Sequence, residues 1–521
     1  MDQTNPLQAE ARASGLQAFG EHRWDDAIAA YGEALTLGED AGLLADLGAA
    51  YQSSWRLARA AELYRRALEL EPGHLRALGN LASACLVMLE QEQALTYRAQ
   101  VLELLADRPA SREAVDAFAD YIFTCTSLWP FSCVATEIRR LSELHLRPFY
   151  PTVARPAPAL ASGRRIRLGY LSGDFNQHSV MDLLEPLFVQ ADRERFEIFC
   201  YYTASRRDNL TAWLERHTRF RSIRGHSDKQ AALLMRRDEL DLLVDLSGYT
   251  SGRRLALLAR HPAPRVATGL GCIMPLGFAG SDYALLDRRV FREADAGLVP
   301  ETLLRIPANM FYRPQPQLEL RAPGHQELVF GCANSLYKLT PQVQACWAEI
   351  LRQLPEAVLS LKARALADPE VLARLRQGFG VLGIGPERIR ASGQSPRPEV
   401  MAWYHGVDIC LDPFPYQGGL TSSEALYMGC PVISLDAGGI NTSVSILDLC
   451  QLKDDITATP ADYIRRAVAL GQSVAAMDPG QRLGLRRRIR DSISRSIVFD
   501  PQHFVASLEA AYEFICSRPG D

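Results

Sequence analysis

The sequence lacks the features that mark membrane, secreted or nucleic-acid-binding proteins. No stretch of its 521 residues approaches the roughly 20 consecutive apolar residues that a membrane helix needs. Residues 1–5 lack the basic and then apolar pattern of a secretory signal. Charge of one sign is not in excess, since 57 Lys and Arg face 61 Asp and Glu and leave a net charge of −4. This balance gives no electrostatic reason to expect nucleic acid or an anionic membrane as the main partner.

Residue patterns that hold metals are also missing. The 11 cysteines include no CxxC pair, and no HxxxH or HExxH spacing occurs. With 47% hydrophobic and 23% charged residues, the composition excludes wholesale disorder and collagen-like classes. At about 150 residues per domain, the length favours three or four structural units. We therefore expect a multidomain, cytoplasmic protein with buried free thiols and no metal site.

The first 105 residues repeat themselves. Leu47-Gly48-x-x-Tyr51 is followed by Ala60, Tyr64, Ala67 and Pro72, which is the tetratricopeptide (TPR) order of two antiparallel helices per repeat. Related residues occur one period earlier and one period later, so we predict about three repeats over 1–105. Such a stack curves and offers a groove for a protein partner. A helical spacer or a homodimer contact is the alternative.

A helical but non-repeating segment separates the repeats from the rest of the chain. Residues 106–160 predict capping and linker helices and then a connector, because Pro is dense in the segments 147–151 and 154–158. Strand and helix patterns then alternate through two predicted halves, 161–320 and 321–521. Expected strands are 166–171, 196–202, 240–246, 328–332, 358–361, 388–391, 407–411 and 431–435. Their continuous apolar runs favour parallel sheets covered on both faces, with ligands at the carboxyl ends of the strands.

The most informative loop is the segment 411–431. A predicted strand ends there, Gly418 and Gly419 let the backbone come close to a ligand, and hydroxyl residues open a helix. The amide groups and the positive dipole end of such a helix suit a diphosphate. Glu424 is placed to accept bonds from ribose hydroxyls. The alternative is a capping box in which Thr421 and Glu424 satisfy the helix's own backbone.

Two further side chains follow predicted strands. Lys338 lies between a strand and a helix, where a cation could neutralise charge on a departing phosphate, although a plain surface lysine is the alternative. His178 lies on a turn after the first strand of the other half. It could act as a base or hold substrate, or it could simply cap a helix.

Several ordered motifs resemble one family. Behind tetratricopeptide repeats, the chain resembles the protein O-linked N-acetylglucosamine (O-GlcNAc) transferases and their SPINDLY-like bacterial and plant relatives, glycosyltransferase family 41. The motifs that carry the resemblance are 169–178, 244–250, 260–264, 337–338 and 410–429. It implies a GT-B fold, that is, two Rossmann-like halves facing a cleft, with a nucleotide sugar held mainly by the C-terminal half and no essential metal. It also implies sugar transfer to Ser or Thr hydroxyls with inversion.

The resemblance assigns roles to individual residues. Lys338 matches the lysine that stabilises the leaving diphosphate, His178 a histidine near acceptor and sugar, and Asp238 a carboxylate near the reaction centre. The implied donor-binding residues are Asn334, Tyr337, Arg397, Gly418, Gly419, Thr421, Ser422 and Glu424.

The sequence also departs from the animal enzymes of this family. Gly419 and Leu420 replace a His-Thr pair at the diphosphate, Asp241 replaces a histidine, and the segment 272–277 replaces a loop that approaches the sugar. Smaller changes occur near the nucleotide, at Ser335, Arg397 and Val400.

We therefore predict an inverting transferase that moves GlcNAc from UDP-GlcNAc to a protein recruited by the repeats. Transfer of another sugar (glucose, fucose or a nonulosonic acid, to flagellin or another surface protein) is one alternative. A degenerate transferase that serves as a repeat-bearing scaffold is the other.

Overall fold

The computed structural model describes residues 5–152, 163–313 and 318–518 as two compact units. One unit, called the repeat unit below, combines Met1–Arg108 with Gln326–Val407, and the other, called the larger unit, combines Pro109–His325 with Asp408–Asp521. The connector predicted at 154–158 lies outside the described residues. Each unit therefore joins segments that are far apart in the sequence.

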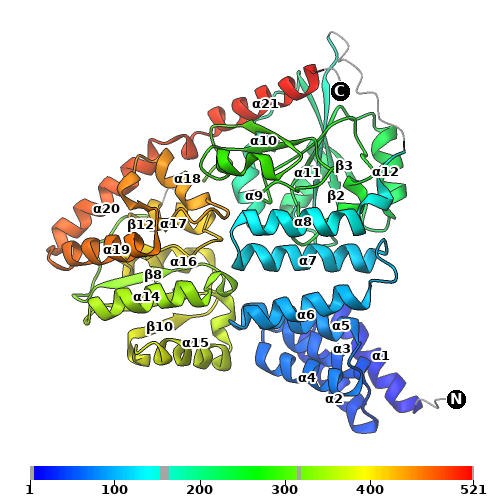
Figure 1. Cartoon of the computed structure of the whole chain (residues 1–521), viewed down its shortest axis with the longest axis horizontal. Coiled ribbons are helices and arrows are strands. Elements are labelled where there is room, and N and C mark those ends of the chain that lie inside the picture. The colour runs from blue at the N-terminus through cyan, green and yellow to red at the C-terminus, as the bar shows by residue number, and fades with distance from the viewer. Residues whose placement is uncertain (1–4, 153–162, 314–317, 519–521) are drawn as a thin grey trace. The chain divides into compact units, whose positions relative to one another are not determined.

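Six helices form three antiparallel pairs at the start of the repeat unit, drawn in blue in Figure 1. They are α1 (Pro6–Gly20), α2 (Trp24–Leu37), α3 (Ala41–Ser53), α4 (Leu57–Leu70), α5 (Leu75–Val87) and α6 (Gln91–Leu104). Close packing explains the small residues of the repeat. A Cβ atom at Gly15 would lie 2.5 Å from the ring of Tyr31, and one at Gly48 would lie 2.6 Å from the ring of Tyr64.

The repeats dock on the second segment of their own unit. Asp368, the N-cap of α15 (Pro369–Val381), accepts the Glu370 amide at 3.0 Å and also the Ala58 amide of α4 at 3.2 Å. This carboxylate thus caps two helices, one of which has no side-chain cap of its own. The Arg364 guanidinium lies 4.4 Å from the centre of the Trp55 ring, and Arg374 pairs with Glu90. The repeats are therefore part of a folded unit.

The larger unit begins with two antiparallel helices, α7 (Arg112–Leu128) and α8 (Phe131–His145), as the sequence predicts. A parallel seven-stranded sheet comes next, with the order β3-β2-β1-β4-β5-β6-β7. Its strands are β1 (Ile166–Ser172), β2 (Phe196–Tyr202), β3 (Arg219–Ser222), β4 (Leu242–Asp245), β5 (Val266–Thr268), β6 (Tyr283–Leu286) and β7 (Thr302–Arg305). The chain builds the sheet from β1 outward to β3 on one side and then returns to add β4 to β7 on the other side of β1. This change of direction defines a doubly wound sheet.

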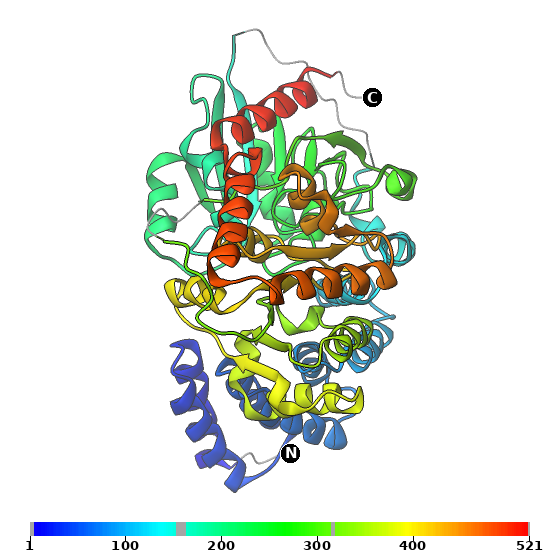
Figure 2. The same cartoon turned by 90° about the vertical axis from the view of Figure 1, so that its left-hand side faces the viewer.

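The helix α21 (Pro501–Ser517), red in Figures 1 and 2, packs on this first sheet. Its residues Phe504, Leu508 and Tyr512 share one hydrophobic core with Leu168 of β1 and Ile198 of β2. The end of the chain therefore packs against residues of β1 and β2 that lie more than 300 positions earlier.

Strands of a second α/β half occur in both units. The repeat unit holds β8 (Val329–Cys332), β9 (Val358–Lys362) and β10 (Ile389–Ser392), in the order β10-β9-β8. The larger unit holds β11 (Ile409–Leu411), β12 (Val432–Leu435) and β13 (Ile456–Thr457), in that order. The pairings within each group are parallel. The predicted helical repeats and parallel α/β halves are confirmed.

Ten of the eleven cysteines are buried and all are free thiols, and only Cys133 is exposed. Among the described residues, no helix combines the length and the apolar character needed to cross a bilayer.

The close contact at Gly48 leads to a stability prediction. Gly48→Ala should lower the free energy of unfolding by about 1–3 kcal/mol, because the new methyl group collides with the Tyr64 ring. Gly32→Ala in α2 is the matched control, since nothing lies within 4 Å of its Cβ position. That change should be neutral or stabilise by up to about 1 kcal/mol. Denaturant unfolding of the full chain measures both, and equal effects would contradict this explanation of the repeat glycines.

Candidate functional site

One candidate loop is the glycine turn, residues 412–419, between β11 and α17 (Leu420–Tyr427). Asp412 follows β11 and is 2% exposed. Its Oδ1 accepts the Gly418 amide at 2.8 Å, and its Oδ2 accepts the Ser434 hydroxyl at 2.7 Å. A single buried carboxylate therefore fixes the turn to the end of β12.

The two glycines have different surroundings. A Cβ at Gly418 would lie 2.5 Å from Ser422 Oγ and 2.7 Å from Thr421 Oγ1, so the turn has no space for a side chain there. Ser422 also hydrogen-bonds Ser443 at 2.6 Å, and Ser443 donates to the Gly418 carbonyl at 2.9 Å. A Cβ at Gly419 would lie 3.3 Å from Met310 Cε. Of the predicted donor ligands, Gly418 and Ser422 thus hold the turn itself in shape.

The helix α17 starts without a side-chain cap. Its N-cap is Gly419, and no side chain there accepts a backbone amide. The capping-box alternative is wrong, because the helix begins at Leu420, before the Thr421 that the box would use as its N-cap. Thr421 is half-buried, and Glu424 is 5% exposed. The first turn keeps the dipole and the amide groups that attract an anion.

In the repeat unit, the lysine loop, residues 333–340, follows β8. Lys338 Nζ donates to Asn334 Oδ1 at 3.3 Å, and the Asn334 amide contacts Cys332 Sγ at 3.6 Å. Tyr337 and Lys338 are half-buried on a short 3-10 turn, Leu336–Lys338. Asn334, Tyr337 and Lys338 are therefore brought together in one loop. Arg397, also half-buried, lies on another element of the same unit, at the first residue of α16 (Arg397–Trp403).

A repeat helix holds the lysine loop. Gln91, the first residue of α6, is 2% exposed and donates to the Leu339 carbonyl at 3.1 Å. Gln344 of α14 (Pro341–Gln353) donates to the same oxygen at 3.0 Å. The residue after Lys338 is therefore fixed from two sides. Sequence reasoning missed Gln91, because nothing in its own repeat signals a contact nearly 250 positions away.

His178 lies at the carboxyl end of β1 and caps α9 (Ser179–Leu184). Its Nδ1 accepts the Val180 amide at 3.3 Å and lies 3.6 Å from Asp174 Oδ2, and its side chain is 44% exposed. In a neutral imidazole ring only one nitrogen carries a proton, so when Nδ1 accepts a hydrogen bond the proton is on Nε2. In this arrangement the ring offers an N–H donor to its surroundings.

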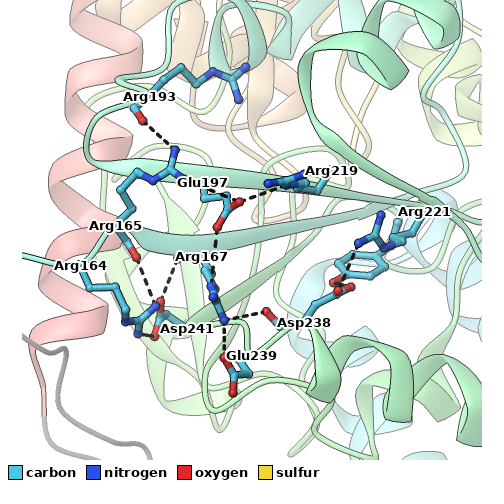
Figure 3. A network of polar contacts seen from close by, with 11 residues as sticks. Arg164, Arg165, Arg167, Arg193, Glu197, Arg219, Arg221, Asp238, Glu239 and Asp241 are labelled. Carbon is cyan, nitrogen blue, oxygen red and sulfur yellow. Dashed lines mark hydrogen bonds and ion pairs between the residues drawn. The ribbon is translucent and has the colours of Figure 1, made fainter.

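Asp238 does not join His178. It follows α12 (Asp228–Arg237) and precedes β4, so it lies at the amino-end edge of the sheet that carries His178 at its carboxyl-end edge. Figure 3 shows it beside Arg221, whose guanidinium is 3.4 Å away, and the Tyr201 hydroxyl donates to it at 2.8 Å. Asp241 lies at the same edge and accepts from Arg164.

Two buried carboxyl groups support loops that connect strands of the first sheet. Asp245 ends β4 and accepts the Gly248 amide at 2.7 Å, and burial raises its pKa to about 6. Glu301 accepts the Gly277 amide at 2.8 Å, and burial raises its pKa to about 7. These two residues hold the turn after β4 and the end of the 272–277 loop.

Within the part of the chain that the structure describes, no three His, Cys, Asp or Glu side chains are grouped closely enough to hold a metal ion.

The strand orders and the loops at the carboxyl ends of the strands define a GT-B type of α/β protein behind helical repeats. Glycosyl transferase family 41 matches residues 138–311 and 319–508, so the chain belongs to that family. A solved O-GlcNAc transferase from Thermobaculum terrenum, a lysine-to-methionine variant, superposes with a TM-score of 0.90. It is 29% identical and covers 99% of this chain and 98% of its own. This likeness confirms the predicted fold class.

Curated relatives give the same family. The probable UDP-N-acetylglucosamine–peptide N-acetylglucosaminyltransferase SPINDLY of Oryza sativa subsp. japonica is 29% identical over 389 residues, which are 72% of this chain and 41% of that protein. The probable enzyme of the same description named SEC, of Arabidopsis thaliana, is 27% identical over 392 residues, which are 71% of this chain and 39% of that protein. The chain therefore spans about two fifths of the length of these relatives.

The buried Glu301 predicts a pH effect on stability. Its pKa of about 7 in the folded chain exceeds the ordinary 4.5, so the folded state holds the proton more tightly than the unfolded chain does. The resulting stabilisation, up to about 3 kcal/mol, is complete below about pH 4.5 and is lost as the pH rises through about 7. Thermal unfolding between pH 5 and 8 should therefore show a smaller fall in Tm for Glu301→Gln than for the natural chain. Equal falls would contradict the assignment.

Proposed function

We propose that this chain is an inverting glycosyltransferase that moves GlcNAc from UDP-GlcNAc to Ser or Thr hydroxyls of a protein. The observation that carries the proposal is the family match over both α/β halves, together with Lys338 on the loop after β8 and Glu424 in α17, the helix that follows the glycine turn. The activity for which the SPINDLY and SEC relatives are named supports the choice of donor and of peptide acceptor.

In this reaction the protein forms no covalent bond to the sugar. Its main contribution is to stabilise the charge that develops on the leaving diphosphate. The bond from the anomeric carbon to the diphosphate oxygen breaks, and the acceptor oxygen bonds to that carbon from the opposite face. We assign the charge that develops on the leaving diphosphate to the Lys338 ammonium and to the first amides of α17. We assign the ribose hydroxyls to Glu424. This assignment uses no metal.

The acceptor hydroxyl must lose its proton as the new bond forms. Because Nδ1 of His178 accepts the Val180 amide, the ring carries its proton on Nε2 and is suited to donate a hydrogen bond rather than to remove a proton. We therefore give His178 a positioning role toward acceptor or sugar. The proton then leaves to a donor phosphate or to water.

The repeats have two roles in this proposal. They recruit the acceptor protein, and through Gln91 they hold the loop that carries Lys338. Asp368 fixes α4 and Gln91 fixes α6 to the second segment of the repeat unit. These contacts support the second role, because a freely moving arm could not hold the lysine loop.

A different donor sugar is the second candidate, and one observation favours it. The Cβ position of Gly419 faces Met310, and the 272–277 loop differs from that of the animal enzymes. Because both surroundings are altered, a sugar such as glucose or fucose is the main competing donor. The scaffold alternative is less well supported, since the chain retains both Lys338 and Glu424.

The central test is the substitution Lys338→Ala. Transfer should fall by about 10²- to 10³-fold, because the charge of the leaving group loses its cation. Intact-mass measurement of candidate acceptor proteins, incubated with a panel of nucleotide sugars, gives both the rate and the sugar. Lys453→Ala is the matched control, because Lys453 is 59% exposed and pairs with Asp448 at the surface. Unchanged turnover of Lys338→Ala with the natural donor would contradict the site assignment.

Asp238 gives a second test, with the opposite expectation. Asp238→Asn weakens two charge-assisted contacts, with Tyr201 and Arg221, and should lower the free energy of unfolding by about 1 kcal/mol. Its transfer rate should stay within about threefold of the natural chain, since it lies at the edge of the sheet away from His178. A large loss of rate with no change in Tm would show that Asp238 acts in the reaction.

A further inference from the structure

A cavity lies at the amino-end edge of the first sheet, opposite the edge that carries His178. It measures about 270 Å³ and is lined by the first residues of β2 and β3 and by residues just before β1 and β2. Among its lining residues are Arg165, Arg193, Glu197, Arg216 and Arg219. Figure 3 shows four of these five, in the same view as Asp238.

The cavity has more positive charge than its own carboxylate can balance. Four arginines against one glutamate leave a net charge of +3. Glu197 lies among three guanidiniums, with Arg219 Nε at 3.1 Å, Arg167 Nε at 3.6 Å and Arg165 Nη2 at 3.8 Å. A single carboxylate cannot form bidentate hydrogen bonds with all three guanidinium groups.

Neutral carbonyl groups hold the other two lining guanidiniums, those of Arg193 and Arg216, and one also contacts Arg165. Arg193 Nη2 donates to the Phe188 carbonyl at 2.6 Å, and Arg216 Nε donates to the Ala212 carbonyl at 3.1 Å. Arg165 Nη1 donates to the Arg193 carbonyl at 3.3 Å. Carbonyl groups orient these side chains but leave their charge in place. The cavity is therefore preformed for an anion.

We propose that this cavity binds a small molecule that carries phosphate. Planar guanidiniums bond phosphate oxygens in pairs, and a phosphate ester with about two negative charges suits the excess charge better than a single carboxylate does. The volume lies just below the range of pockets for drug-sized ligands, which favours a compact ligand. Since the cavity and His178 lie at opposite edges of one sheet, this ligand does not compete with the sugar donor.

The test is a calorimetric titration of the full chain with inorganic pyrophosphate. The double variant Arg165→Gln/Arg219→Gln should weaken binding by about tenfold or more, because two charge-assisted contacts are lost. Glu197→Gln should tighten binding severalfold, since a competing carboxylate is removed. A gain of affinity cannot result from a damaged fold. Arg112→Gln is the control, as this arginine of α7 is 83% exposed.

Fluorescence locates the bound probe. Trp213 stacks on His217, which lines the cavity, with ring centres 4.3 Å apart. Pyrophosphate should change the emission of the natural chain and of Lys338→Ala equally, and Trp213→Phe should abolish the change. Binding that the arginine variant leaves intact, or that Lys338→Ala removes, would place the probe elsewhere and overturn the proposal. Binding of a glutamate-rich peptide in place of pyrophosphate would overturn it too. None of these outcomes depends on whether the chain transfers a sugar.

Discussion

The candidate donor site depends on the buried carboxylate of Asp412. It accepts the amide of Gly418 with one oxygen and the hydroxyl of Ser434 with the other, so the end of β11, the glycine turn and β12 form one rigid piece. The Tyr463 hydroxyl also donates to the Asp412 carbonyl at 3.0 Å. A turn fixed in this way gives α17 a constant starting point. An electrostatic site needs this preorganisation, because dipoles that must reorient at the moment of reaction stabilise charge poorly.

The lysine loop shows the same principle with different residues. Its backbone oxygen at Leu339 takes hydrogen bonds from Gln91 of the repeats and Gln344 of α14. The repeats thereby support the loop that carries the candidate catalytic cation. Contacts of this kind tie the segment Met1–Arg108 to Gln326–Val407 in one compact unit.

Much of the fold could be predicted from the sequence, because continuous apolar runs such as 166–171 and 196–202 are strong signals for buried parallel strands. The edge strand β3 was missed, since Arg219, Arg221 and Ser222 give it no apolar pattern. The glycine turn and Lys338 could be found because both follow predicted strands. Asp238 precedes a strand, and position alone could have placed it at the other edge of the sheet. Gln91 and Asp412 act through tertiary contacts, which spacing along the chain does not reveal.

Nucleotide binding tests the central claim most directly. The full chain should bind UDP in a calorimetric titration and should not bind GDP or CMP. Glu424→Gln should weaken UDP binding through the lost ribose contact, about tenfold. Binding of none of the three nucleotides, or UDP affinity that is unchanged in both Glu424→Gln and Lys338→Ala, would contradict the account.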